Sequence, residues 1–407
     1  MIAPSTLRRE AVLPAEEPTV GAGAASLSFE NLFGIGLDAL TSMPPLYVLS
    51  ILGLPNSWLQ RRNRYSEYKI IDGWRLRRTL RFLANVAIPS VPRTPPSFGL
   101  PLVNRLFWQP TVILQRPDHH GSYTSYPDEA WFFVNGVATN DSVAQVNSAY
   151  LSYLFHRPLT MIQNSTDSLL LDLLECIVGK GWYRFTEAAT KTFPPIYDAL
   201  KREDKHRVVV IAHSQGTIIM ATVLKMLAAV LIPPPEDREL ALEAPFGAEA
   251  PLYAPPEFVY PDQDPWRAED FVPLTEQELA KLEVYCFANC ANTMKTILAG
   301  VDGKSIPWIE SLGNEFDLVA RLGMLAPKPA ERGIDIDGPH YVRLNGWGHL
   351  LNAHYLQDIE ACQRVGRKRG GTGGAAPYVL TNIEAYPDCE VPRLFSYING
   401  GEPLSEG

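Results

Sequence analysis

The stretch from Arg207 to Met220 reads RVVVIAHSQGTIIM, and it decides the fold. Its first half is a run of β-branched residues, which is typical of a strand buried on both faces of a parallel sheet. Its second half opens a long apolar segment that reaches residue 232 and is ended by Pro233 and the prolines after it. We therefore predict a strand over 207–213, a turn at Ser214 and a helix over 215–232.

A serine in such a turn is a candidate nucleophile. A nucleophile elbow places the serine in strained backbone between a strand and a helix, with small residues two positions before and after it. Ala212 and Gly216 occupy those positions around Ser214. The alternative is an ordinary serine that caps the helix. His213 precedes Ser214, and because strand side chains alternate we expect it to point away from the site.

Serine needs a base to take its proton and an acid to orient that base. In the sequence order Ser, then acid, then His, both candidates follow Ser214. The predicted strand 306–312 leads into Asp317, and His349 lies in a glycine-rich loop after the predicted strand 340–345. The spacing leaves room for one helix and one strand between the acid and the histidine. We predict a triad of Ser214, Asp317 and His349.

Other acids and another histidine compete for these roles. Glu310 and Glu315 are alternatives to Asp317, which we prefer because Glu310 lies inside an apolar strand. His354 is the alternative to His349. It lies inside the helix predicted after the loop, where a packing role is the better interpretation.

With these motifs in place, the chain resembles the alpha/beta-hydrolase superfamily. AHSQG (212–216) resembles its nucleophile elbow, NEFDLV (314–319) its acid loop and GWGH (346–349) its histidine loop. The resemblance covers roughly residues 110–365 and is closest to esterase- and lipase-like members. It implies an α/β fold with a mostly parallel central sheet flanked by helices. It also implies a serine hydrolase that cleaves a small-molecule or lipid ester through an acyl-enzyme, without a cofactor.

The resemblance further implies an oxyanion hole. Its first donor would be the backbone N–H of Gln215, at the positive end of the helix. Its second would come from the loop FVNGVATND, where we choose Val137, just after Gly136, with the Thr139 hydroxyl as an assistant. A plain turn followed by a helix cap is the other interpretation of this loop. The candidate substrate-binding residues are Gly136, Thr139 and His213.

Alternating strands and helices predict an α/β catalytic domain over 110–365. Around it we expect a loose arm over 1–28, a helical extension over 29–109, and a flexible linker and tail over 366–407. The other expected strands are 111–115, 131–136, 159–164 and 282–290, and the other expected helices are 142–155, 167–178 and a segment over 186–204 broken by Pro194 and Pro195.

Two segments raise questions of partner and substrate. The basic, aromatic stretch 47–86 is interpreted as a collar that packs on the catalytic domain, or alternatively as a peripheral contact with an anionic membrane. The acidic, proline-rich stretch 233–275 stands where a lid is expected, and a surface excursion is the alternative. The aromatic residues that would suit an apolar substrate there are Phe246, Tyr253, Phe258, Tyr260 and Trp266.

Composition excludes several classes. The chain has 407 residues, 46% of them hydrophobic, and a net charge of −9, which argues against a nucleic-acid partner. Five cysteines without a disulfide pattern and an N-terminus without a signal-peptide core predict a cytoplasmic protein, peripheral to a membrane if 47–86 binds lipid. Neither the Cys286/Cys290 pair nor the run 118–120 (Asp-His-His) has the spacing of a metal site. No oligomeric state follows from the sequence.

The same triad serves other reactions. An acyl-enzyme passed to an alcohol or amine would give an acyltransferase or cyclase, and a thioesterase or a peptidase would use the same groups. A hydrolase fold kept as a membrane-associated scaffold is the non-enzymatic alternative, and retention of all three residues argues against it.

Overall fold

The computed structural model describes eight segments of the chain, and the structural statements below concern these alone. Several predictions lie outside them: the arm 1–28, nearly all of the extension 29–109, the helix over 167–178 and the linker 366–377. The described segments are 64–67, 112–116, 126–135, 141–163, 187–231, 266–299, 305–360 and 378–403.

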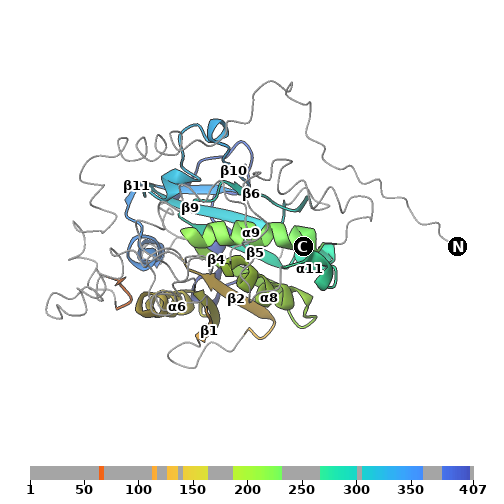
Figure 1. Cartoon of the computed structure of the whole chain (residues 1–407). Coiled ribbons are helices and arrows are strands. Elements are labelled where there is room, and N and C mark those ends of the chain that lie inside the picture. The colour runs from red at the N-terminus through yellow and green to blue at the C-terminus, as the bar shows by residue number, and fades with distance from the viewer. Residues whose placement is uncertain are drawn as a thin grey trace, which may run out of the picture.

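An eight-stranded sheet forms the centre of the molecule (Figure 1). Its order is β1-β3-β2-β4-β5-β9-β11-β12, and its strands are parallel except at the two edges, where β1 runs antiparallel to β3 and β12 antiparallel to β11. The predicted mostly parallel central sheet is confirmed. The strands are β1 Val112–Arg116, β2 Glu129–Val134, β3 Leu159–Gln163, β4 Arg207–His213, β5 Leu282–Phe287, β9 Trp308–Phe316, β11 His340–Trp347 and β12 Tyr378–Leu380.

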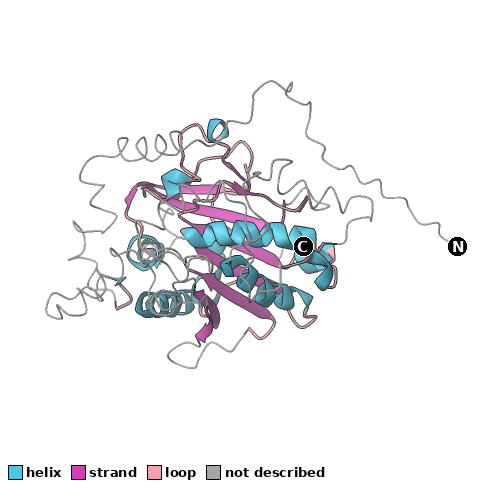
Figure 2. Ribbon diagram, in the orientation of Figure 1, coloured by secondary structure: helices cyan, strands magenta, loops and turns pink. Residues whose placement is uncertain are grey.

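Helices flank the sheet, as Figure 2 shows by colour. They are α6 Asp141–Phe155, α8 Glu187–Lys201, α9 Gln215–Ala229 and the short α11 Glu276–Leu279, with 3-10 turns η8 Ala268–Asp270, η9 Ala320–Leu322, η10 Ala330–Arg332 and η12 Arg393–Gly400 and a π-helical turn η11 Leu351–Leu356. Two-residue strands complete the described elements: β6 Thr293–Met294, β7 Leu298–Ala299, β8 Ser305–Ile306 and β10 Asp335–Ile336.

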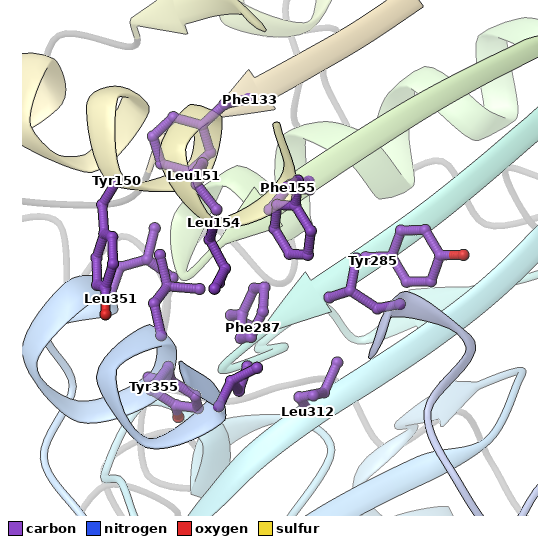
Figure 3. Close-up of a cluster of buried hydrophobic side chains, with 14 of the residues drawn as sticks. Phe133, Tyr150, Leu151, Leu154, Phe155, Tyr285, Phe287, Leu312, Leu351 and Tyr355 are labelled. Atoms are coloured by element: carbon purple, nitrogen blue, oxygen red, sulfur yellow. The ribbon is translucent and has the colours of Figure 1, made fainter. Parts of the chain in front are cut away.

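Strand β4 is buried on both faces, as its sequence predicts. Val208 and Val210 pack into a core with α8 and α9. Val209 and Ile211 face the opposite core, which α6, η11 and η12 close. Figure 3 shows this second core, where α6 side chains such as Leu151 meet side chains of the strands and of η11. Because both faces are covered, the turn after β4 is held rigidly in place.

Helix α8 corrects one prediction. Pro194 and Pro195 were expected to break it, yet it runs unbroken from Glu187 to Lys201. A proline inside a helix removes a backbone hydrogen bond. Here the neighbouring side chains of Phe193 and Ile196 are fully buried against the sheet and α9, and this apolar burial offsets the loss.

The chain between Asp317 and His349 also differs from expectation. The spacing predicted one helix and one strand. The structure has the strand β11, but the helix is replaced by the 3-10 turns η9 and η10 and the short strand β10.

The domain boundary at residue 365 is wrong. Strand β12 joins the central sheet beside β11, and η12 buries Leu394 and Tyr397 in the second core. The α/β domain therefore extends to at least residue 403. A three-residue strand and a 3-10 turn carry no periodic pattern, so neither could be predicted from the sequence.

Within the described part of the chain, no helix combines the length and the apolar character that crossing a bilayer requires.

Candidate active site

Ser214 lies at the turn between β4 and α9, in backbone that side chains rarely adopt. Its φ is 58° and its ψ is −127°. Hydrogen bonds with two residues hold this conformation. The Ser214 N–H donates to the Phe287 carbonyl (3.0 Å), and the Ser214 carbonyl accepts from the N–H (2.8 Å) and the hydroxyl (2.7 Å) of Thr217. The Ser214 side chain makes no capping hydrogen bond to α9. The ordinary N-cap interpretation therefore fails, and the strained turn has the form of an elbow.

Glycine is required at position 216 because α9 begins against the end of β2. A Cβ on Gly216 would lie 2.4 Å from the Val134 carbonyl oxygen and 2.8 Å from that of Asn135. Ala212, the other small residue, is fully buried. The small residues thus let the strand and helix approach closely, as the sequence pattern predicts.

His349 lies between Ser214 and Asp317 and contacts both. Its Nε2 is 2.8 Å from the Ser214 Oγ. Its Nδ1 is 3.0 Å and 2.9 Å from the two carboxylate oxygens of Asp317. All three residues are buried, His349 being the most exposed at 7%. Three residues from three separate strand ends therefore form one hydrogen-bonded chain, in which the serine hydroxyl can pass its proton to the imidazole.

Within this chain of hydrogen bonds, Asp317 and His349 each favour the ionised form of the other. Burial opposes the ionised forms of both Asp317 and His349. For Asp317, the attraction and hydrogen bond of His349, together with the hydrogen bonds from Tyr355 and Val319, outweigh burial and lower its pKa. For His349, the carboxylate of Asp317 outweighs burial in turn and raises its pKa. The pair is thus arranged to stabilise a positive imidazolium.

Tyr355 is a member of the site that the sequence analysis missed. Its hydroxyl donates to Asp317 Oδ2 at 2.6 Å and accepts from the Asn314 N–H at 3.2 Å. The Val319 N–H donates to the other oxygen of Asp317 at 2.8 Å. Asp317 is therefore held by three donors that include His349. No local pattern marks Tyr355, because its partner lies 38 residues earlier in the chain.

His213 does not point away from the site, and that expectation was wrong. Its ring stacks on the ring of His349, with centroids 4.8 Å apart and planes at 30°. Its Nε2 donates to the His349 carbonyl at 2.9 Å. Burial, followed by the neighbouring His349, lowers the pKa of His213 to about 3, so the ring is neutral at physiological pH. His213 is buried behind the imidazole, and its candidacy as a substrate-binding residue stays a prediction.

The competing acids and histidine are used elsewhere. Glu310 accepts from the backbone N–H groups of Arg393 (2.6 Å) and Leu394 (3.2 Å). Glu315 accepts from the Asn345 N–H at 2.7 Å. His354 accepts at Nδ1 from the Leu350 N–H at 2.9 Å, which agrees with the packing role expected for it.

The oxyanion-hole candidates are only partly described. Gln215 is the first residue of α9, so its N–H belongs to the positive end of that helix. Val137, Gly136 and Thr139 lie outside the described residues. No group of three potential metal ligands occurs among the residues that the structure describes, and the run 118–120 is not among them.

Of the aromatic residues named for the predicted lid, Trp266 is the one that lies in the described part of the chain. Trp266 contacts Phe193 of α8 edge-on, with ring centroids 5.4 Å apart, and stacks on Phe271 at 5.9 Å. Its ring thus packs against the core beside α8. The other aromatic residues predicted to suit a substrate there, Phe246, Tyr253, Phe258 and Tyr260, precede the described segment.

Comparison with known proteins adds little to this geometry. No family model matches the chain, and no curated protein matches it at a significant level. One similar solved structure is an esterase/lipase from an uncultured bacterium, with 10% identity and a TM-score of 0.32, covering 71% of this chain and 94% of that one. Another is esterase B from Lactobacillus rhamnosis, with 11% identity and a TM-score of 0.33, covering 77% and 95%. Similarities with so low an identity and TM-score do not indicate the activity of this chain.

Proposed function

We propose that this chain is a serine hydrolase that cleaves carboxylic esters through an acyl-enzyme. The observation that carries the proposal is the position of the His349 ring, within hydrogen-bond distance of the Ser214 hydroxyl on one side and of the Asp317 carboxylate on the other. A nucleophile, a base and an orienting acid are the three parts that this chemistry needs.

In the proposed reaction the Ser214 oxygen attacks the ester carbonyl while its proton moves to His349 Nε2. The backbone N–H groups of Gln215 and Val137 are the proposed donors to the oxyanion that forms. Collapse of this intermediate breaks the bond to the alcohol, which takes the proton from His349. A water molecule, deprotonated by the same nitrogen, then releases the acid and restores Ser214.

The environment of the three residues supports this cycle. His349 must carry a positive charge after the first proton transfer, and Asp317 already raises the pKa of that ring. His349, together with the donors that Tyr355 and Val319 supply, keeps Asp317 ionised despite its burial. The strained backbone of Ser214 matches the turn that exposes a nucleophile to its substrate.

A fluorophosphonate probe, which reacts with activated serines, tests the proposal. We expect wild-type protein to be labelled and Ser214→Ala to lose labelling. Ser148→Ala is the matched control, because Ser148 is also a buried serine but its hydroxyl donates to a backbone carbonyl within α6. Labelling that persists in Ser214→Ala would overturn the nucleophile assignment.

Esters of increasing acyl length, with the released acid measured, then test the reaction itself. We expect acid release that disappears in Ser214→Ala and a preference among chain lengths that defines the substrate. A wild-type protein that neither reacts with the probe nor releases acid from any ester would overturn the proposed function.

A further inference from the structure

The four described residues of the N-terminal extension, 64–67, pack directly against the helix that follows His349. The ring of Tyr65 stacks on Tyr150 of α6, with centroids 4.9 Å apart and planes at 13°. The Tyr65 carbonyl accepts from the Asn352 side chain at 2.8 Å, and Asn352 also donates to the Val146 carbonyl of α6 at 3.1 Å. Residues 64–67 therefore pack between α6 and η11, as the collar interpretation predicts for this part of the extension.

Glu67 completes the contact with a buried carboxylate. It is 2% exposed. One of its oxygens accepts from the Asn352 N–H at 2.7 Å and the other from the Ala353 N–H at 3.0 Å. These are first-turn N–H groups, which have no partner within a helix and carry its positive dipole end.

The turn η11 has no cap of its own. The residue at its N-cap is Leu350, whose side chain cannot accept a hydrogen bond, and none is formed there. Glu67 supplies the missing acceptor from 285 residues away in the sequence. Burial is costly for such a group: it raises the pKa of Glu67 to about 7, against the lowering effect of the N–H groups it binds.

Two members of the site depend on the turn that Glu67 caps. Leu350, its N-cap, directly follows His349, so the start of η11 sets the backbone from which the imidazole projects. Tyr355, near its end, donates to Asp317. A shift of η11 would therefore move His349 relative to Ser214 and loosen Asp317 at the same time.

We infer that Glu67 is a positioning residue for the hydrolase site: by capping η11 it holds His349 and Tyr355 in the geometry that activates Ser214. Residues 64–67 thus act as part of the catalytic apparatus. The activity readouts of this inference rest on the proposed function, while its structural readout does not.

Glu67→Ala in the full chain is the direct test. Misplacing a catalytic group by about 1 Å costs around a hundredfold in rate, so we expect the fluorophosphonate labelling rate and kcat to fall roughly ten- to hundredfold with little change in KM. Glu67→Gln keeps one acceptor oxygen and should lose less. Leu200→Ala, which changes a buried residue of α8 in the core on the opposite face of the sheet, is the control for general loss of stability.

A second-site variant separates capping from a general structural role. Asparagine at an N-cap accepts from the same first-turn N–H groups. We therefore expect Leu350→Asn to restore part of the labelling rate of Glu67→Ala. It should not restore Leu200→Ala, whose defect would lie in stability alone.

Hydrogen exchange gives a readout independent of activity. Amides 350–356 should exchange faster in Glu67→Ala than in wild type, while those of α8 stay unchanged. If they exchange at the wild-type rate, or if Glu67→Ala labels as fast as wild type where Ser214→Ala does not label, the inference is overturned and the proposed function stands. If wild type never labels, the proposed function fails, and the exchange rates still decide the inference.

Discussion

His213 and His349 stack ring on ring, and His213 also donates a hydrogen bond to the backbone carbonyl of His349. The residue next to Ser214 thus supports His349, the proposed base. Because burial and the nearby His349 keep His213 neutral, with a pKa of about 3, it adds no positive charge that would oppose an imidazolium at His349. The surroundings of the two histidines thus suit different tasks: in the proposed mechanism His349 exchanges protons, and His213 holds it in place.

Two substitutions of His213 divide these contributions. His213→Phe keeps an aromatic ring beside His349 but cannot donate, and we expect kcat to fall about tenfold, the effect of one hydrogen bond worth about 1.4 kcal/mol. His213→Gln offers a side-chain N–H at a similar reach and should retain more activity. Steady-state kinetics on one ester substrate compare them, and equal rates for the two variants would count against the hydrogen bond.

The pH profile reports the Asp317–His349 pair. The base must be neutral, and Asp317 raises the pKa of His349 above its ordinary 6.5, so the acid limb of kcat/KM should lie above pH 6.5. In Asp317→Asn the attraction is lost while burial still disfavours the charged ring, so the limb should move below pH 6.5. Its kcat should fall by about 10⁴. A limb that stays in place would show that another group titrates.

The sequence predicts much of this site because its signals are local. The β-branched run before Ser214, the small residues around it, and the order of Asp317 and His349 each belong to a short motif with a mechanical reason. The bounds and the two-faced burial of β4 follow from the same apolar run.

Sequence patterns do not predict contacts between residues far apart in the chain, nor side-chain directions where the backbone is strained. Tyr355 and Glu67 act on partners 38 and 285 residues away, and neither lies in a motif. His213 was expected to point away because strand side chains alternate, but the positive φ of Ser214 ends the pleat there and both residues contact His349. Strand β12 was missed because three residues are too few to show a period.

Gly216 allows a sharp test of the elbow. In Gly216→Ala the new methyl group would lie 2.4 Å from the Val134 carbonyl oxygen, so α9 must move away from β2, and we expect loss of labelling together with a lower midpoint of thermal unfolding. Gly333→Ala is the control for a glycine without close neighbours: unlike Gly216 it has a positive φ (64°), but no atom lies within 4 Å of the added carbon. That control should lose only about 1–2 kcal/mol and keep its labelling. Similar behaviour of both variants would contradict the close-approach explanation.

A buried ion pair ties the end of the chain to the sheet and provides a stability test. Arg157 is fully buried, its Nε donates to Glu129 at 2.6 Å, and its Nη2 donates to the Gly401 carbonyl at 3.0 Å. Arg157→Leu leaves Glu129 with its weaker partner Arg207 and frees the C-terminal segment. Removing one partner of a buried pair costs about 3–5 kcal/mol, and we expect a loss of this order in urea unfolding at pH 7.

The loss in Arg157→Leu should depend on pH in a direction set by Glu129. Burial opposes its charge, but Arg157, Trp131 and Arg207 together lower its pKa below the ordinary 4.5. The stability that this lowered pKa contributes is fully present above pH 4.5 and is lost as pH falls through the folded-state pKa, so the difference between Arg157→Leu and wild type should shrink in acid. Arg202→Leu breaks only an exposed pair with Asp204 and should change nothing measurable at either pH. A difference that stays constant down to low pH would mean that Arg157 stabilises the fold through its packing rather than through its charge.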